Sequence, residues 1–238
     1  MNMPDELQRL LYANGADIVD FADLRDITTY ARNSFPFGVS IAVALYPQII
    51  SQIQNGPTKQ YYEEYKRTNH LLDQLSHHAV QFLKEHGHKA KWFPATGYGY
   101  NYDRKTLSTR LPHKTAATRA GLGWIGKCAM LVTKTFGSAV RITTVLTDAR
   151  LPPGEPMETN FCGKCTLCVD ACPGHAAIGK NWQVNLYRDH FYDAFACQKA
   201  ARELAIKVGI PKHICGICIA VCPWTQKYMR RVNWAPTN

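Results

Sequence analysis

The chain has 238 residues, enough to bury a core as one large domain or two smaller ones. Its formal net charge is +10, so its basic surface suits either ordinary solvation or an anionic partner such as tRNA or an acidic electron donor. Residues 38–50 form the longest apolar run, which Pro47 interrupts and which is too short to cross a bilayer. The polar N-terminus predicts no secretory signal peptide, and the nine cysteines then favour a reducing, cytoplasmic location.

The first part of the chain predicts helices alternating with strands. Residues 4–13 are expected to form a short helix, and residues 16–24 an edge strand or its lead-in. Residues 37–46 are a nearly continuous apolar run, which favours a strand buried on both faces. The longest helix is expected over about residues 58–86, followed by a strand over residues 89–95.

The long helix over residues 58–86 carries an apolar stripe at three- and four-residue steps. The stripe is expected to consist of Tyr61, Tyr65, Leu72, Leu75, Ala79 and Phe82. The histidines of this helix lack a cysteine or carboxylate partner at metal spacing, so we expect them on its polar face. These histidines are His70, His77, His78 and His86.

A helix and two strands are expected around a glycine-rich segment in the middle of the chain. The helix covers residues 113–120, and the strands, residues 128–133 and 139–147, are expected to pair around a turn at residues 134–138. The pattern G-x-G-x-x-G lies between helix and strands, at Gly121, Gly123 and Gly126. A dinucleotide site needs a strand before the glycines and a helix after them, the reverse of this order. The glycines are therefore expected to let the backbone approach a cofactor or a packed element closely.

Two cysteine runs lie in the last third of the chain. Residues 162–173 have the spacing C-x2-C-x2-C-x3-C-P, and residues 215–223 repeat it without the first cysteine, which Cys197 can supply. The full run is the ligand pattern of two-cluster bacterial ferredoxins, in which the cysteine before the proline binds the other cluster. The first predicted 4Fe–4S cluster therefore takes Cys162, Cys165, Cys168 and Cys222. The second takes Cys172, Cys197, Cys215 and Cys218.

Two other interpretations of the cysteines remain open. C-x2-C pairs also suit structural zinc, and cysteines can form disulfides, but neither explains two runs that end in x3-C-P. Each oxidised cluster with four thiolates contributes a charge of about −2, which reduces the net charge to roughly +6.

Two cysteines lie outside these runs. Cys197 is expected on a helix over residues 187–208, facing inward beside Phe191, Phe195 and Leu204. Cys128 begins a predicted strand and is either a small buried thiol or a ligand or contact at a cofactor face.

Four blocks of the chain form a recognisable series. They are RAGLGWIGKCAMLV from Arg119, a turn ending FGS at Ser138, CGKCTLCVDACPGHAAI from Cys162 and CGICIAVCPW from Cys215. Together they resemble the epoxyqueuosine reductase family and its shorter double-cluster relatives, over roughly residues 110–224. The resemblance covers all eight predicted cluster ligands.

The resemblance implies an α+β fold. Residues 1–155 would form a nitroreductase-like α/β layer that binds cobalamin, and residues 156–238 a bacterial-ferredoxin-like module with two 4Fe–4S clusters. Reductive dehalogenases share this combination of cobalamin with two clusters. The helical-repeat extension that family members use on tRNA is expected to be absent, which leaves tRNA an open partner.

The resemblance also implies residues that contact the corrinoid. In the family, the strand after the A-G-L-G-W-I-G-K block lines the corrinoid. This strand maps onto Leu131, Val132 and Thr133, with Ser138 and Arg141 nearby in the sequence.

The proton donor of the family is an aspartate before this block, in a D-S-x-P-x-x-E-R context. Counting back without gaps places it at Leu107, with His113 and Lys114 at the Glu-Arg positions. The nearest acid is Asp103, in an aromatic loop over residues 98–103. The expected donor is therefore Asp103 or one of its neighbours Tyr100 and Tyr102.

Two functions from different classes follow from the resemblance. In the first, the protein is a cobalamin-dependent reductase, and a low-potential donor such as ferredoxin or flavodoxin supplies electrons through the clusters to reduce a small molecule or modified nucleoside. In the second, it is a two-cluster electron-transfer protein that reduces a partner protein or its corrinoid and has no substrate of its own. Nucleic-acid binding by the basic surface is a third possibility.

Overall fold

The computed structural model describes residues 2–28, 30–32, 34–96 and 102–232, which form two compact units. The first unit comprises Met1–Val43, Thr68–Gly123 and Arg141–Met157. The second comprises Ala44–Arg67, Trp124–Val140 and Glu158–Asn238. The second unit thus joins nearly all of the predicted iron–sulfur domain to two earlier segments, and the domain boundary after residue 155 stays a prediction.

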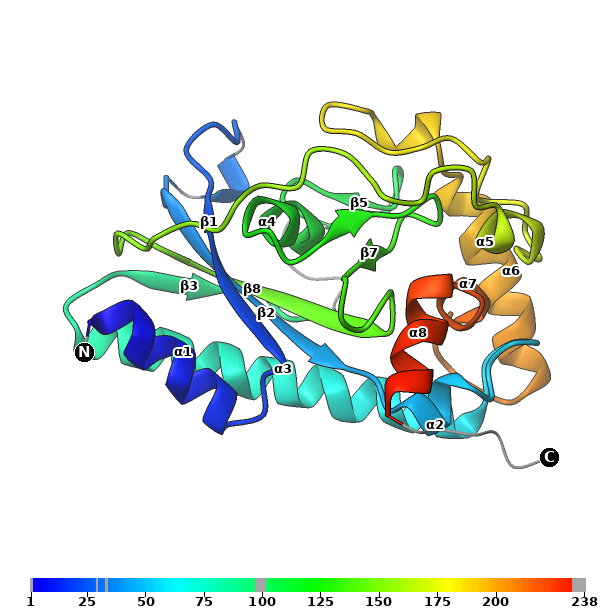
Figure 1. Ribbon diagram of the computed structural model, residues 1–238, viewed down its shortest axis with the longest axis horizontal. Coiled ribbons are helices and arrows are strands. Elements are labelled where there is room, and N and C mark those ends of the chain that lie inside the picture. The colour runs from blue at the N-terminus through cyan, green and yellow to red at the C-terminus, as the bar shows by residue number, and fades with distance from the viewer. Residues whose placement is uncertain (1, 29, 33, 97–101, 233–238) are drawn as a thin grey trace. The chain divides into compact units, whose positions relative to one another are not determined.

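The first unit is built on a four-stranded sheet (Figure 1). Its strand order is β1 (Ile18–Asp23), β2 (Phe37–Ala44), β8 (Val140–Thr147) and β3 (Ala90–Trp92). Helices α1 (Met3–Ala13) and α3 (Lys59–Glu85) lie on one face of the sheet, and α4 (His113–Arg119) lies on the other. The fully buried side chains of its core include Leu7, Leu11, Val39, Ile41, Leu72, Leu75, Leu83 and Val145. Seven consecutive buried residues in β2 confirm the predicted strand with two covered faces.

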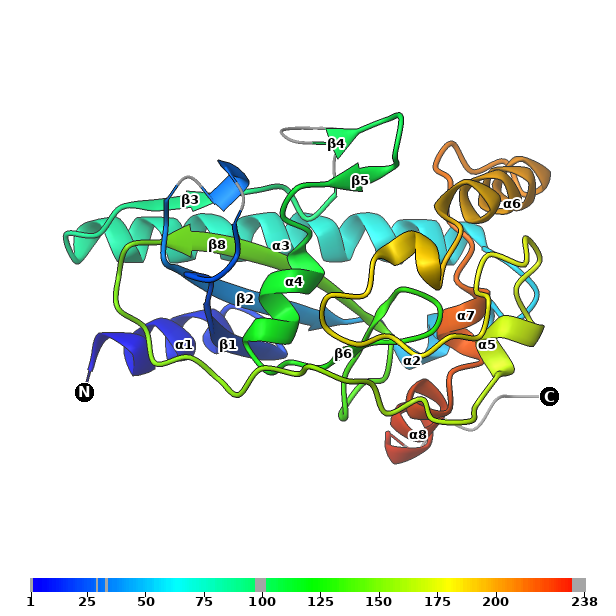
Figure 2. The same cartoon turned by 90° about the horizontal axis from the view of Figure 1, so that it is seen from above.

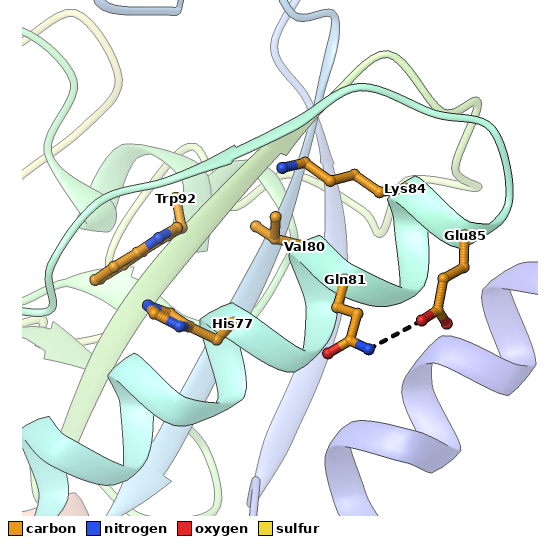
Figure 3. Close-up of a pocket in the computed structure, with 6 residues that line it drawn as sticks. All are labelled: His77, Val80, Gln81, Lys84, Glu85 and Trp92. Carbon is orange, nitrogen blue, oxygen red and sulfur yellow. Dashed lines mark hydrogen bonds between the residues drawn. The ribbon is translucent and has the colours of Figure 1, made fainter.

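Helix α3 confirms the long predicted helix and corrects one position of its stripe. Leu83 is fully buried, whereas Phe82 only packs against the edge of the core. The predicted histidines on the polar face, His70, His77 and His86, are exposed, and His78 is half-buried. The His77 ring meets Trp92 edge-on, with ring centroids 4.5 Å apart, beside an open groove along α3 and β3 (Figure 3). This groove contains no cysteine and a single histidine.

The predicted pairing of residues 128–133 with residues 139–147 is wrong. Strand β7 (Leu131–Val132) pairs with β6 (Trp124–Ile125) in a separate two-stranded sheet, and β8 lies between β2 and β3. The reason is burial: β8 carries five consecutive buried residues, which require neighbours on both edges and cover on both faces. The two segments lie close in the sequence, which favoured a hairpin, but β8 pairs within the larger sheet instead.

The glycine-rich segment has the element order that the sequence predicts. Helix α4 ends before Gly121, which has φ +77°, and β6 follows, so a dinucleotide-binding turn is not formed. A Cβ atom on Gly121 would lie 2.6 Å from the carbonyl oxygen of Glu155. The predicted close approach at Gly121 is therefore to a packed backbone segment.

The second unit consists mainly of short helices. They are α2 (Pro47–Ile50), α5 (Leu167–Asp170), η2 (Arg188–His190), α6 (Ala194–Lys207), α7 (Ile217–Ala220) and α8 (Pro223–Arg231). Figures 1 and 2 both show α5 beside α7, and the two helices are in contact. The core of the unit includes Ile50, Ile53, Ile219, Ala220, Tyr228 and Met229. None of the helices formed by the described residues combines enough length with enough hydropathy to span a bilayer.

The predicted helix over residues 187–208 is interrupted. Helix α6 begins only at Ala194, because the Asp193 side chain accepts hydrogen bonds from the N–H groups of Phe195 and Ala196 and caps the helix there. Phe191 is buried as predicted, but the Phe195 side chain is 52% exposed. The remaining described strands, β4 (Tyr102–Asp103) and β5 (Ser108–Thr109), form a small hairpin.

Candidate iron–sulfur site

Four cysteines from distant parts of the sequence line one cavity in the second unit. Cys162, Cys165, Cys168 and Cys222 share the walls of a space of about 140 Å³. This is the set that the spacing predicts for the first cluster, including the cysteine taken from the second run. The volume equals that of several water molecules, at about 30 Å³ each, whereas one zinc ion lies only about 2.3 Å from its thiolates. The cavity therefore suits a multi-iron cluster better than a single ion.

Local hydrogen bonds turn the first cysteine run around the cavity. The Cys162 N–H donates to Asn160 Oδ1 at 2.9 Å, and the Cys165 N–H donates to the Cys162 carbonyl at 3.0 Å. Gly163, at φ +53°, allows the tight turn between them. The run then enters the single helical turn α5, which carries Cys168.

Cys222 is the N-cap residue of α8, with Pro223 at the first helical position. Burial raises the pKa of the Cys222 thiol, and hydrogen bonds from the N–H groups of Thr225 and Trp224 oppose that rise. Such N–H groups at a helix start stabilise a thiolate. The proline thus fixes the helix start directly after this cysteine.

The other four cysteines are linked through shared neighbours in the second unit. Burial raises the pKa of the Cys215 thiol, a hydrogen bond from the Ile217 N–H lowers it, and the charges of Cys197 and Cys172 raise it further. The Ala176 N–H donates to Cys172 Sγ at 3.3 Å. Cys218 lies on α7, which packs against α5.

Tyr192 lies beside the second set, and no sequence pattern predicted it there. Burial, followed by the charge of Cys197 and a hydrogen bond with it, raises the pKa of the Tyr192 phenol far above its usual range. Cys218 contributes in the same direction. A phenol that stays protonated can donate to a thiolate, so Tyr192 is a polar neighbour of the second cluster's ligands.

The described residues contain no group of three histidine, cysteine or carboxylate side chains spaced to hold one metal ion. In a 4Fe–4S cluster each thiolate binds a different iron atom, so the thiolates stand farther apart than the ligands of one ion.

The turn between β6 and β7 brings two more side chains to the cavity. Lys127 is 4% exposed, and its ammonium group donates to the Cys165 carbonyl at 2.9 Å. Cys128 is 5% exposed and lines the same cavity as the four cysteines. The thiol is buried, as the first sequence interpretation of Cys128 expects, and a role as ligand or contact at a cofactor face stays a prediction. Lys127 lies in the G-W-I-G-K block, but no sequence pattern assigned it a role.

Several interactions converge on the Cys128 thiol. A hydrogen bond with Cys168 lowers the pKa of the Cys128 thiol, but a second one with Cys218 and the burial of the thiol raise it well above its ordinary value. Two backbone hydrogen bonds hold the turn: Gly126 N–H to Met130 O at 2.9 Å, and Ala129 N–H to Gly126 O at 2.8 Å.

The residues predicted to line a corrinoid are mostly buried. Leu131, Val132, Thr133 and Ser138 belong to the second unit and are at most 4% exposed. The Ser138 N–H donates to Thr225 Oγ1 at 3.1 Å, and Thr133 Oγ1 donates to the Gly137 carbonyl at 3.2 Å. Val132 lines the cysteine cavity.

Arg141, the fifth residue of that set, belongs to the first unit and is half-buried. Its Nε donates to Asn69 Oδ1 and its Nη2 to Thr96 Oγ1, both at 2.5 Å. Burial is the main cause of a lowered pKa of His113, and a hydrogen bond to the Pro94 carbonyl opposes it. The positive charge of Arg141 lowers the pKa of His113 further.

The predicted proton donor Asp103 is exposed on the β4–β5 hairpin. Its carboxylate accepts the Lys105 N–H at 2.8 Å, and this hydrogen bond is the main cause of its lowered pKa. Tyr102 is half-buried beside it, and Tyr100 lies outside the described residues. Leu107, at the ungapped family position, has φ +49° in the hairpin turn.

Residues 161–225 match the family model described as a 4Fe-4S double cluster binding domain. This span contains all eight predicted ligands and excludes Cys128. The cysteine-rich part is a double 4Fe–4S module.

Curated relatives extend the similarity beyond this module. The chain is 29% identical to the epoxyqueuosine reductase of Lactococcus garvieae over 189 residues, which cover 79% of this chain and 51% of the relative. It is 34% identical to the enzyme of the same name from Bacillus anthracis over 116 residues, or 48% of this chain and 29% of the relative. The chain thus spans about half the length of the first relative and less of the second. The similarity that the four sequence blocks predicted is confirmed.

Solved structures share the fold. The catabolic reductive dehalogenase NpRdhA, in complex with 3-bromo-4-hydroxybenzoic acid, matches with a TM-score of 0.70 at 16% identity, over 92% of this chain and 31% of its own. Epoxyqueuosine reductase from Bacillus subtilis matches with a TM-score of 0.63 at 20% identity, over 93% of this chain and 65% of its own. The predicted α+β fold, an α/β layer with a ferredoxin-like module, is confirmed.

Proposed function

We propose that the protein is an iron–sulfur reductase similar to epoxyqueuosine reductase, in which two 4Fe–4S clusters deliver electrons to a corrinoid for the reduction of a substrate. The observation that carries this proposal is the convergence of Cys162, Cys165, Cys168 and Cys222 on one cavity. Clusters held by four thiolates exchange single electrons at potentials set by burial, charge and hydrogen bonds. The similarity to epoxyqueuosine reductases supports the corrinoid part of the proposal.

The chain supplies the surroundings that such clusters need. Backbone N–H groups of Ala176, Trp224 and Thr225 donate to ligand sulfurs, and the Tyr192 phenol hydrogen-bonds Cys197. The buried ammonium of Lys127 adds a positive charge beside the first cavity. These groups favour the more negative, reduced form of a cluster.

The corrinoid is supported by the relatives rather than by the residues predicted to line it. The solved structure of a reductive dehalogenase that shares this fold suggests a mechanism for B12-dependent dehalogenation. Cobalamin supplies one-electron chemistry at cobalt that makes or breaks bonds to carbon. Leu131, Val132, Thr133 and Ser138 are at most 4% exposed, and they stay proposed contacts of the corrinoid. Arg141, the fifth proposed contact, is half-buried and exposes more of its surface than the other four.

Anaerobic reconstitution with iron, sulfide and cobalamin tests this function. We expect about eight irons per chain and stoichiometric cobalamin whose visible spectrum changes on binding. The matched control is the chain reconstituted with iron and sulfide alone. A chain that carries both clusters but leaves the cobalamin spectrum unchanged would contradict the corrinoid part and retain the electron-transfer part.

We further propose Asp103 as the proton donor, to be tested with Asp103→Asn on an epoxyqueuosine-modified stem loop, the ligand in a solved epoxyqueuosine reductase structure. Loss of a general acid should lower the rate about 100-fold or more. The lowered pKa leaves little protonated carboxyl at pH 7, so the rate should rise as the pH falls towards that pKa. Asp148→Asn is the control, since Asp148 is another exposed aspartate that accepts a backbone N–H at 2.8 Å. Unchanged turnover in Asp103→Asn would exclude Asp103.

Two observations favour the second candidate function, a two-cluster electron-transfer protein without its own substrate. The predicted corrinoid residues are mostly buried, and the predicted proton donor has a lowered pKa. Such a protein would show reversible cluster reduction, no cobalamin binding and no turnover. The reconstitution experiment separates the two functions.

The partners follow from the same chemistry. We propose a low-potential donor such as ferredoxin or flavodoxin, whose acidic surface would complement the basic chain. A modified nucleoside, with or without its tRNA, is the proposed substrate class. The eight thiolates fit a reducing, cytoplasmic compartment away from the membrane.

A further inference from the structure

Helix α6, at the edge of the second unit in Figures 1 and 2, has two different faces. Cys197, a predicted ligand of the second cluster, shares the inner face with Ala201 and Leu204, at steps of four and three residues. Ala201 is buried, and a Cβ atom on Gly56 would lie 3.6 Å from Leu204 Cδ2, so this face packs into the second unit. Because a helix turns about 100° per residue, a second set of residues at the same steps faces away from Cys197.

The outer face of α6 combines apolar and basic side chains. It consists of Phe195, Lys199, Arg202 and Ile206. Phe195 is 52% exposed and Ile206 64%, and both cations between them are exposed as well. The ion pairs formed by the described residues include neither Lys199 nor Arg202. Glu203, the one acidic residue of α6, lies beside this face rather than on it.

The composition of the outer face of α6 fits a protein partner better than a nucleic acid. Interfaces with nucleic acids are polar and strongly basic, and single-stranded bases stack on flat rings. The exposed Ile206 offers no ring, whereas apolar side chains around an arginine are typical of the centre of a protein interface. The two cations favour a partner whose own docking surface is acidic. A patch on a single helix suits the small interfaces of short-lived electron-transfer complexes.

The place of the outer face in the fold indicates what such a partner would do. A protein seated on it is separated from the face that carries Cys197 by about one helix diameter, roughly 10–12 Å. Clusters held by thiolates exchange single electrons, and electrons cross short distances most readily. A carrier on this face would therefore meet a ligand of the second cluster across one helix.

We propose that the outer face of α6 is the docking surface for an acidic one-electron carrier protein, which passes its electron to the second cluster. The reduced carrier loses one electron and the oxidised cluster gains it, and no bond forms or breaks. The cations steer the carrier to the face, and the two apolar side chains form the dry centre of the contact. The inference rests on the two clusters of the proposed function and needs neither corrinoid nor substrate.

The test is a calorimetric binding titration of the full chain, reconstituted anaerobically with iron and sulfide and without cobalamin. The probes are a flavodoxin and a plant-type ferredoxin, two acidic one-electron carriers. At low salt we expect at least one of them to bind. The binding should weaken strongly at about 1 M salt, where charges are screened beyond about 3 Å.

Two double variants test the two kinds of side chain on the face. Lys199→Glu with Arg202→Glu should weaken carrier binding about tenfold or more at low salt, because it reverses the charge of the face. Phe195→Ser with Ile206→Ser should weaken it by a similar factor at any salt concentration, because it removes the apolar contact.

The matched control reverses the charge of two exposed lysines in the first unit, Lys84→Glu with Lys89→Glu. It changes the net charge of the chain by the same amount as Lys199→Glu with Arg202→Glu. Its affinity for the carrier should stay near that of the wild type, because charges distant from the docking surface are largely screened.

Iron and sulfide per chain show whether both clusters assemble, independently of carrier binding. About eight irons in every variant, with equal affinities in the α6 variants and the control, would overturn the proposal. So would a wild type that holds eight irons and binds neither carrier, an outcome that leaves the proposed function intact. Charge reversal on α6 that weakened the binding of a tRNA stem loop but not of the carrier would assign the face to nucleic acid and also overturn it. A wild type that binds a carrier but assembles no clusters would contradict the proposed function instead, while the docking surface stood.

Discussion

Replacing Cys222 with alanine is expected to remove the first cluster and leave the second, although Cys222 belongs to the second cysteine run. The expected iron content falls from about eight to about four per chain, because a cluster that loses one of its four thiolates is not retained. The reason is spatial: Cys222 lines the cavity of Cys162, Cys165 and Cys168. Iron analysis of anaerobically reconstituted protein measures this loss.

The EPR spectrum of the reduced variant identifies which cluster remains. Cys222→Ala should give the same spectrum as Cys162→Ala and a different one from Cys215→Ala. Cys128→Ser serves as the control, since it changes a cysteine in the same cavity and should retain about eight irons. A Cys222→Ala spectrum that matched Cys215→Ala would show that each run binds its own cluster.

Gly137→Ala is expected to destabilise the second unit and to lower its iron content. Gly137 has φ +60°, and a Cβ atom there would lie 2.2 Å from the Thr225 backbone nitrogen. Left-handed strain and overpacking against backbone together should cost roughly 2 to 5 kcal/mol. Thr225 lies in the first turn of α8, three residues after Cys222, so relief of the clash is expected to displace this predicted ligand of the first cluster.

Thermal unfolding and iron content of the reconstituted protein measure this effect. Gly179→Ala is the matched control, because Gly179 has φ +85° but a Cβ atom there would meet nothing within 4 Å. It should cost only the strain, about 1–2 kcal/mol, and keep both clusters. Equal unfolding temperatures and equal iron in the two variants would show that the approach of Gly137 to α8 does not matter for the site.

The sequence by itself determined the features that depend on short-range chemistry. Cysteine spacing fixes which sulfurs can reach one cluster, since three cysteines two residues apart lie on one turn of chain. The apolar run of β2 required two covered faces, because no polar side could face water. The order of helix, glycines and strand around Gly121 excluded a dinucleotide turn, because that turn needs the strand before the glycines and the helix after them.

Only the tertiary structure decided the features that depend on contacts between distant residues. The neighbours of β8 are set by the burial of the whole sheet, and a nearby turn at residues 134–138 could not reveal them. Cys128, Lys127 and Tyr192 carry no spacing signal, because they reach the cysteines through the folding of two other segments, the turn between β6 and β7 and the residues before α6. Such segments come together only through the packing of the entire unit, so the local sequence pattern alone does not encode their proximity.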